Sequence, residues 1–169
     1  MNLILCGMMG SGKTTVGIKI AQRTGKSFVD TDALIEERHG KISDIFARFG
    51  EDYFRDLESE IVQELCRQDG LVISTGGGLV LRKKNVDALR QNGKIIFLRA
   101  SLETLSNRLR ADSTRPLLQS ETESITARIS KLLTERTSIY EGAASCVVDV
   151  DKKSVDEIAP EIINLTQNN

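Results

Sequence analysis

The sequence of 169 residues suits one compact domain and is too short for two domains of ordinary size. Hydrophobic residues make up 40% of it, enough to build a single core, which argues against a disordered chain. Its 23 lysines and arginines nearly cancel its 24 aspartates and glutamates, so no global electrostatic attraction to nucleic acid or to an anionic membrane is expected.

The three cysteines, Cys6, Cys66 and Cys146, are far apart and form no CxxC pair. With only one histidine in the chain, they predict reduced thiols rather than a zinc site. No apolar run approaches the roughly 18 residues that span a bilayer. The apolar start lacks the basic region of a signal sequence. We therefore expect a cytoplasmic protein, and a monomer, that binds neither nucleic acid nor a membrane.

Short apolar runs alternate with amphipathic segments along the whole chain. The runs are rich in Val, Ile and Leu, which is typical of strands covered on both faces, and they lie at 2–6, 27–30, 71–75, 94–98 and 145–150. This alternation predicts an α/β fold, a five-stranded parallel sheet flanked by helices with right-handed crossovers. We expect one domain over residues 1–169.

Apolar spacings of three and four predict helices between the strands. One stripe covers 52–68, a second follows the predicted N-cap Ser101, and a third covers 125–133. The last segment opens with a capping box, Ser154 to Glu157. An interior proline removes a helix hydrogen bond, so this helix either kinks or starts nearer Pro160.

The first strand runs into a phosphate-binding motif. Residues 7–14, GMMGSGKT, satisfy G-x-x-x-x-G-K-[ST], and a helical pattern follows them. The glycines let backbone N–H groups and a helix N-terminus converge on phosphate oxygens. We expect Lys13 to reach the β/γ-phosphates of ATP and the Thr14 hydroxyl to bind Mg²⁺. The predicted nucleotide-binding residues here are Gly10, Ser11, Gly12, Lys13, Thr14 and Thr15. The alternative is an ordinary strand–turn–helix connection.

Two acids follow the second strand, where ligands of open α/β sheets bind. One of the two, Asp30 or Asp32, can help to hold hydrated Mg²⁺, while the other can accept a hydrogen bond from a substrate hydroxyl. The alternative for Asp32 is a solvated N-cap of a helix over 33–38. The strands at 71–75 and 94–98 do not end in the Asp of a switch GTPase or motor ATPase, and the chain has no N-K-x-D guanine signature.

The third strand runs into Thr75 and three consecutive glycines. Consecutive glycines are entropically costly, so Gly76, Gly77 and Gly78 favour close approach of the backbone to a ligand over a simple tight turn. Ser74, just before them, can bind a metal-linked water.

A basic stretch near Arg115 precedes a polar segment. In a small kinase this pattern is typical of a lid that closes over the nucleotide, here at about 109–123. Arg108 and Arg110 belong to the same basic stretch. The alternative to a role of these two arginines in the lid is that they are solvated charges at a helix end.

Together these motifs resemble shikimate kinases, and the resemblance covers essentially the whole chain. The matching segments are GMMGSGKTTVG at 7–17, FVDTD at 28–32, FGEDYFRDLE at 49–58, STGGG at 74–78, RPLL at 115–118 and ERTSIYEGAA at 135–144. Gluconate kinases and nucleoside monophosphate kinases share the phosphate loop, but we do not expect them to carry this series.

The resemblance implies a nucleoside monophosphate kinase-like fold and ATP-dependent phosphorylation of the 3-hydroxyl of shikimate, on the route to chorismate and the aromatic amino acids. By position, Asp32 matches the acid that holds substrate hydroxyls and is the proposed base. Arg55 and Arg136 match arginines that bind the shikimate carboxylate, and residues 76–78 match the substrate-side glycine loop, within a substrate segment of about 31–60.

The resemblance also assigns the nucleotide side. Arg115 matches the lid arginine near the phosphates, Arg108 matches an adenine contact, and the magnesium shell comprises Thr14, Asp30 and Ser74. Glu58, three residues after Arg55, is expected to orient it. Where relatives often place an arginine near the adenine, this chain has 151–153, Asp-Lys-Lys, so adenine contacts from that loop stay open.

Two alternatives remain at this point. The chain can be a kinase of a related small molecule such as gluconate, which an assay with both acceptors separates. It can also be a nucleotide-binding regulatory module whose acceptor site has decayed. The presence of Asp32, Arg55 and Arg136 argues against the second alternative.

Overall fold

The computed structural model describes residues 1–111 and 124–167. In this part of the chain, five parallel strands form one sheet in the order β2-β3-β1-β4-β5. The strands are β1 (Asn2–Cys6), β2 (Ser27–Asp30), β3 (Leu71–Ser74), β4 (Gly93–Arg99) and β5 (Cys146–Asp149). All five runs predicted from the sequence are confirmed as strands, with ends that differ by at most one residue.

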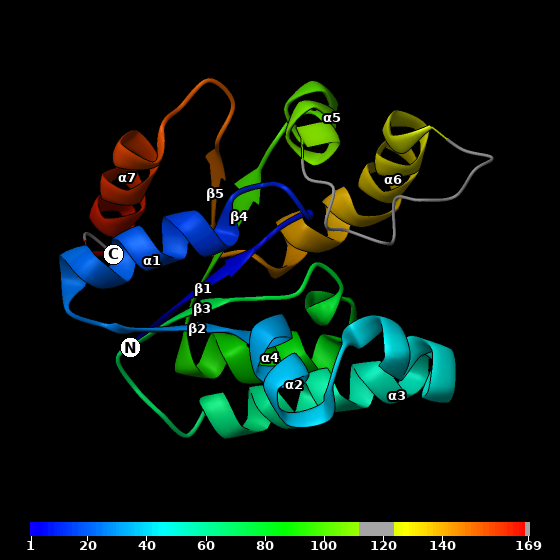
Figure 1. The fold of residues 1–169 in the computed structure, drawn as a ribbon. Coiled ribbons are helices and arrows are strands. Elements are labelled where there is room, and N and C mark those ends of the chain that lie inside the picture. Colours follow the sequence, from blue (N-terminus) through cyan, green and yellow to red (C-terminus); the bar gives the residue numbers. More distant parts are fainter. Residues whose placement is uncertain (112–123, 168–169) are drawn as a thin grey trace.

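Helices cover both faces of the sheet, so the predicted α/β fold, a parallel sheet flanked by helices in three layers, is confirmed (Figure 1). α1 and α7 lie side by side on one face, and α3 and α4 pack together on the other. The helices are α1 (Lys13–Thr24), α2 (Thr31–His39), α3 (Ile42–Leu65), α4 (Lys83–Asn92), α5 (Leu102–Ala111), α6 (Ile125–Ala143) and α7 (Val155–Gln167), and η1 (Leu79–Leu81) is a 3-10 helix.

The strand order explains where functional residues gather. β1 is buried along its whole length between β3 and β4, as its unbroken apolar run predicts. Because the strands are parallel, the carboxyl ends of β1, β2 and β3 lie at the same edge of the sheet. The phosphate loop, Asp30 and Ser74 therefore emerge next to one another.

Two helices differ from the sequence prediction. The predicted helix at 52–68 is the second part of α3, which also has an earlier part joined at Gly50, where φ is 82°. A positive φ breaks the helix without steric cost only at glycine. α2 begins at Thr31 and its N-cap is Asp30, whose Oδ1 accepts from the N–H groups of Asp32 and Ala33. The alternative of Asp32 as N-cap is therefore wrong.

The last helix starts where its capping box predicts. Glu157 Oε2 accepts from both the backbone N–H and the hydroxyl of Ser154, each at 2.8 Å. Pro160 lies inside α7, so a start nearer Pro160 is wrong. Burial of the apolar side chains of α7, including Ile158 and Ile162, offsets the hydrogen bond that proline cannot make. No helix within the described ranges is long and apolar enough to cross a membrane.

Asn2 is a buried polar side chain that ties β1 to the start of β3. Its Oδ1 accepts from the Leu71 N–H and its Nδ2 donates to the Gln68 carbonyl, both at 2.9 Å. The side chain thus completes hydrogen bonds of a backbone segment that the ladder leaves open.

We expect Asn2→Leu to lower the free energy of unfolding by about 1–3 kcal/mol, because it leaves the Leu71 N–H buried without an acceptor. Urea denaturation measures the change. Gln68→Ala is the matched control, because Gln68 takes part through its backbone carbonyl and its side chain is exposed. Equal stability of Asn2→Leu and wild type would contradict the role of Asn2.

Candidate active site

Residues 7–12 form a tight loop between β1 and α1. Gly12 is the N-cap of α1 with φ 95°, and no side chain caps the helix there. The first N–H groups of α1 are therefore left available to an anion at the loop. The Ser11 hydroxyl is buried without a hydrogen-bond partner in the described chain. The Lys13 ammonium lies over the loop and donates to the carbonyls of Gly7 and Met8, each at 2.9 Å. These features fit a triphosphate.

The predicted metal ligands lie together beside this loop. Thr14 Oγ1 donates to Asp30 Oδ2 at 2.9 Å and lies 3.5 Å from Ser74 Oγ. The described residues contain no group of three or more His, Cys, Asp or Glu that could hold a metal. One carboxylate with hydroxyl oxygens suits Mg²⁺, which keeps several waters and binds phosphate oxygens. The donor set therefore fits a hydrated magnesium ion.

The glycine loop is fastened to its neighbours through backbone groups. Both the N–H and the hydroxyl of Thr75 donate to the Leu5 carbonyl at 3.0 Å. The Gly76 N–H donates to the Thr31 hydroxyl at 2.9 Å. These bonds hold the loop against β1 on one side and the start of α2 on the other.

Charged side chains occupy the space where side chains of this loop would lie. A β-carbon built on Gly76 would overlap Asp32 Oδ1 and lie 3.0 Å from Glu58 Oε1. A β-carbon on Gly78 would overlap the guanidinium of Arg55. Asp32, Glu58 and Arg55 thus fill the volume that side chains at positions 76 and 78 would need, so only glycine fits at these two positions.

The middle glycine faces a different group of residues. A β-carbon on Gly77 would lie 3.8 Å from Arg136 Nη1, 3.7 Å from the Tyr140 hydroxyl and 3.8 Å from the Gly7 carbonyl. Asp32 from α2, Arg55 from α3 and Arg136 from α6 are thus brought together around residues 76–78. These three residues are far apart in the sequence, so the spacing of residues along the chain could not predict that they lie together.

The family model described as shikimate kinase matches residues 9–167. The chain belongs to the shikimate kinase family.

Individual members of the family align over almost the full length. A shikimate kinase of Sulfurihydrogenibium sp. is 43% identical over 96% of this chain and 95% of its own. The shikimate kinase of Acinetobacter baumannii in complex with shikimate has a TM-score of 0.92 at 34% identity, covering 99% of this chain and 93% of that one. That of Bacteroides thetaiotaomicron has a TM-score of 0.91 at 31% identity, covering 99% and 98%.

The Arg55 guanidinium is held by two carboxylates of its own helix. It donates to Glu58 Oε2 at 2.7 Å and to Glu51 Oε1 at 3.0 Å, and only 11% of its side chain is exposed. Without the family resemblance, the sequence suggested an exposed charge here. The i−4 and i+3 acids flanking Arg55 were the available signal that it is held in place.

Two buried carboxyl oxygens at this site lack hydrogen-bond partners in the described chain, Asp32 Oδ1 and Glu58 Oε1. Burial raises the pKa of Asp32, and the neighbouring Asp30 adds to this, against the opposing effect of Lys13 and Arg55. Burial also raises the pKa of Glu58 to about 7, although Arg55 lowers it in part. Asp32 is partly exposed whereas Glu58 is fully buried, so Asp32 is the acid of the two that a ligand hydroxyl can reach.

Three more residues were predicted on the nucleotide side, and the structure describes two of them. Arg108 Nη1 donates to the Gly10 carbonyl at 3.1 Å, so α5 contacts the phosphate loop. Thr15 is exposed in the first turn of α1. Arg115 and most of the predicted lid at 109–123 lie outside the described residues.

The sequence analysis missed two residues of the site, Thr31 and Tyr140. Tyr140 follows Arg136 by four residues, a spacing that places both on one helix face.

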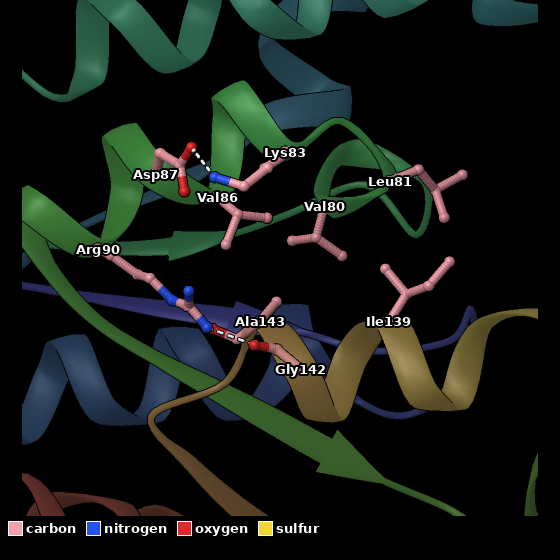
Figure 2. A pocket seen from close by; sticks show the side chains of 9 residues that line it. All are labelled: Val80, Leu81, Lys83, Val86, Asp87, Arg90, Ile139, Gly142 and Ala143. Atoms are coloured by element: carbon pink, nitrogen blue, oxygen red, sulfur yellow. Dashed lines mark hydrogen bonds and ion pairs between the residues drawn. The ribbon is translucent and has the colours of Figure 1, made fainter.

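A groove of about 250 Å³ lies between η1, α4 and the end of α6, and the charged cluster does not line it (Figure 2). Its lining residues come from η1, α4 and the end of α6: Val80, Leu81, Lys83, Val86, Asp87, Arg90, Ile139, Gly142 and Ala143. Within it, Arg90 donates to the carbonyls of Gly142 and Ala143. This contact fixes the end of the helix that carries Arg136.

We expect the stability of wild type, relative to Glu58→Gln, to fall as pH rises from about 4.5 to about 7. The folded state binds a proton on Glu58 more tightly than the unfolded chain does, so the benefit is complete below 4.5 and lost above 7. Urea denaturation of both proteins across this range measures the difference. A difference in unfolding free energy that does not change with pH would contradict the raised pKa.

Proposed function

We propose that the chain transfers the γ-phosphoryl group of ATP to the 3-hydroxyl of shikimate, on the route to chorismate. We infer that residues 1–169 form one kinase domain, with a substrate segment at about 31–60 and a lid at about 109–123. The observation that carries this proposal is the convergence of Asp32, Arg55 and Arg136 on a glycine loop next to the phosphate loop.

Arg55 and Arg136 bind the shikimate carboxylate in this proposal. A planar guanidinium matches a carboxylate through two parallel hydrogen bonds, which an ammonium cannot copy. The two carboxylates that hold Arg55 support this role, because a pre-oriented guanidinium loses less freedom when it binds. The absence of side chains at Gly76 and Gly78 supports the site in another way, because it lets Asp32 and Arg55 lie directly against the loop backbone.

Asp32 binds the attacking hydroxyl and takes its proton. The hydroxyl oxygen forms a bond to the γ-phosphorus, the bond from that phosphorus to the ADP oxygen breaks, and the proton moves to the Asp32 carboxylate. The unpartnered Oδ1 and the raised pKa of Asp32 support this role. Because the transition state is loose, positioning of the hydroxyl contributes more than the strength of the base.

The nucleotide binds at the phosphate loop through Gly10, Ser11, Gly12, Lys13, Thr14 and Thr15. Lys13 moves from the loop carbonyls to the phosphates, Arg115 approaches them from the lid, and Arg108 lies toward the adenine. Thr14, Asp30 and Ser74 hold Mg²⁺, which neutralises phosphate charge when bound. We also propose a monomer that acts in the cytoplasm; its three cysteines are free thiols, which suits a reducing compartment.

Coupled ADP release from ATP–Mg²⁺ tests the function. We expect release to depend on shikimate and to stay at background with gluconate or without an acceptor. Transfer to gluconate in preference to shikimate would instead assign a related small-molecule kinase. Tight ATP–Mg²⁺ binding without transfer to either acceptor would favour a regulatory module.

We expect Asp32→Asn to lower kcat by about 100-fold or more, with a much smaller change in the KM for ATP, because it removes the proton acceptor. Steady-state kinetics with varied ATP measures both. Asp44→Asn, the same change at an exposed acid in the first turn of α3, is the control. Equal losses in kcat and in ATP affinity would assign Asp32 a structural role.

We expect Arg136→Lys to raise the KM for shikimate by about ten- to a hundredfold and to leave the KM for ATP unchanged. Lysine keeps the charge and loses the two-pronged geometry. Arg67→Lys, at an exposed site after α3, makes the same change away from the cluster. An unchanged shikimate KM would show that Arg136 does not contact the carboxylate.

A further inference from the structure

We propose that Tyr140 is a positioning residue, whose hydroxyl sets the distance between Arg136 and the glycine loop and thereby shapes the carboxylate end of the substrate site. This inference rests on the proposed function. The segment at 135–144 contains Tyr140, but no motif gave this residue a role. We place its effect on Arg136 and the glycine loop, not on the reacting groups themselves.

The Tyr140 side chain is fully buried at the meeting point of three functional segments. Its hydroxyl donates to the Gly77 carbonyl at 2.6 Å and lies 3.7 Å from the Met8 sulfur of the phosphate loop. Its ring stacks on Phe97 of β4, with centroids 5.1 Å apart and planes at 30°. The stacked ring holds the hydroxyl in one place, because a buried aromatic side chain has few rotamers available.

The hydroxyl also lies beside the Arg136 guanidinium. Both Tyr140 Oη and Arg136 Nη1 lie within 4 Å of one point, the place of a β-carbon on Gly77. Burial raises the pKa of Tyr140, and Arg136 offsets this only in part, so the phenol stays protonated. A phenol that donates to the Gly77 carbonyl keeps acceptor lone pairs on its oxygen, so it can accept from the guanidinium, and a hydrogen bond from Arg136 acts to lower the pKa of Tyr140. One hydroxyl group thus connects the loop and the arginine.

The far end of α6 is held separately. Arg90 of α4 donates to the carbonyls of Gly142 and Ala143, which anchors the last turn of the helix (Figure 2). That contact fixes the end of α6 against α4, and it does not involve the glycine loop. Among the described residues, the Tyr140 hydroxyl donates the side-chain hydrogen bond that joins α6 to residues 76–78. Its loss would therefore leave the helix in place and loosen the loop against Arg136.

Tyr140→Phe removes the hydroxyl and keeps the ring. We expect the KM for shikimate to rise by about three- to tenfold, the cost of one hydrogen bond, with the KM for ATP unchanged. Thr134→Val deletes a hydroxyl from an exposed position of the same helix, outside the proposed substrate segment, and should leave both constants unchanged. A general loss of structure would instead raise both KM values, and thermal unfolding monitors the folded state of each variant.

A double-mutant cycle tests whether Tyr140 acts through Arg136. In the Arg136→Lys background, we expect Tyr140→Phe to change the shikimate KM by less than twofold, because the arginine that it positions is gone. Full additivity of the two changes would overturn the proposal, and so would an unchanged shikimate KM in Tyr140→Phe with an active wild type. Absence of transfer to shikimate in the wild type would overturn the proposed function itself, and this inference with it.

Discussion

The site depends on the lack of side chains at two places in the loop after β3. At Gly76 and Gly78 the volume of a β-carbon is already filled by a carboxylate and a guanidinium from α2 and α3. Because these charged groups press directly against the backbone, they sit at the edge of the sheet where β1, β2 and β3 end. The same edge carries the phosphate loop. Close approach of backbone and charge thus brings two halves of a kinase site within reach of one another.

Holding these charges in a partly buried site has an energetic cost. Arg55 and Glu58 are nearly excluded from solvent, and Glu58 Oε1 and Asp32 Oδ1 are left without donors. An unpartnered buried acceptor costs about 1–3 kcal/mol. A ligand hydroxyl can offset this cost at Asp32, which is partly exposed, whereas Glu58 is closed to solvent. The raised pKa values of Asp32 and Glu58 have the same origin, since burial disfavours the charged form.

Local pattern accounted for most of the fold. The five apolar runs and the motif at 7–14 predicted every strand of the described sheet and the loop before α1, because strand burial and a phosphate loop are written in consecutive residues. Choices between close neighbours were harder. Asp30 and Asp32 are both plausible caps, and Asp30 is the one that lies before the first turn of α2 and accepts from the N–H groups of Asp32 and Ala33. That choice freed Asp32 to face the glycine loop.

The sequence by itself determined where the five strands lie along the chain, the phosphate loop and, through its resemblance, the family. The spacing of Glu58 three residues after Arg55 already predicted their contact within one helix. Only the tertiary structure decided that Arg55 lies against Gly78, that Thr31 anchors Gly76, and that Tyr140 reaches Gly77 from 63 residues away. The physical reason is range. Caps, turns and apolar periods act between residues a few positions apart, whereas hydrogen bonds across the sheet edge depend on how α3 and α6 pack, which no local spacing encodes.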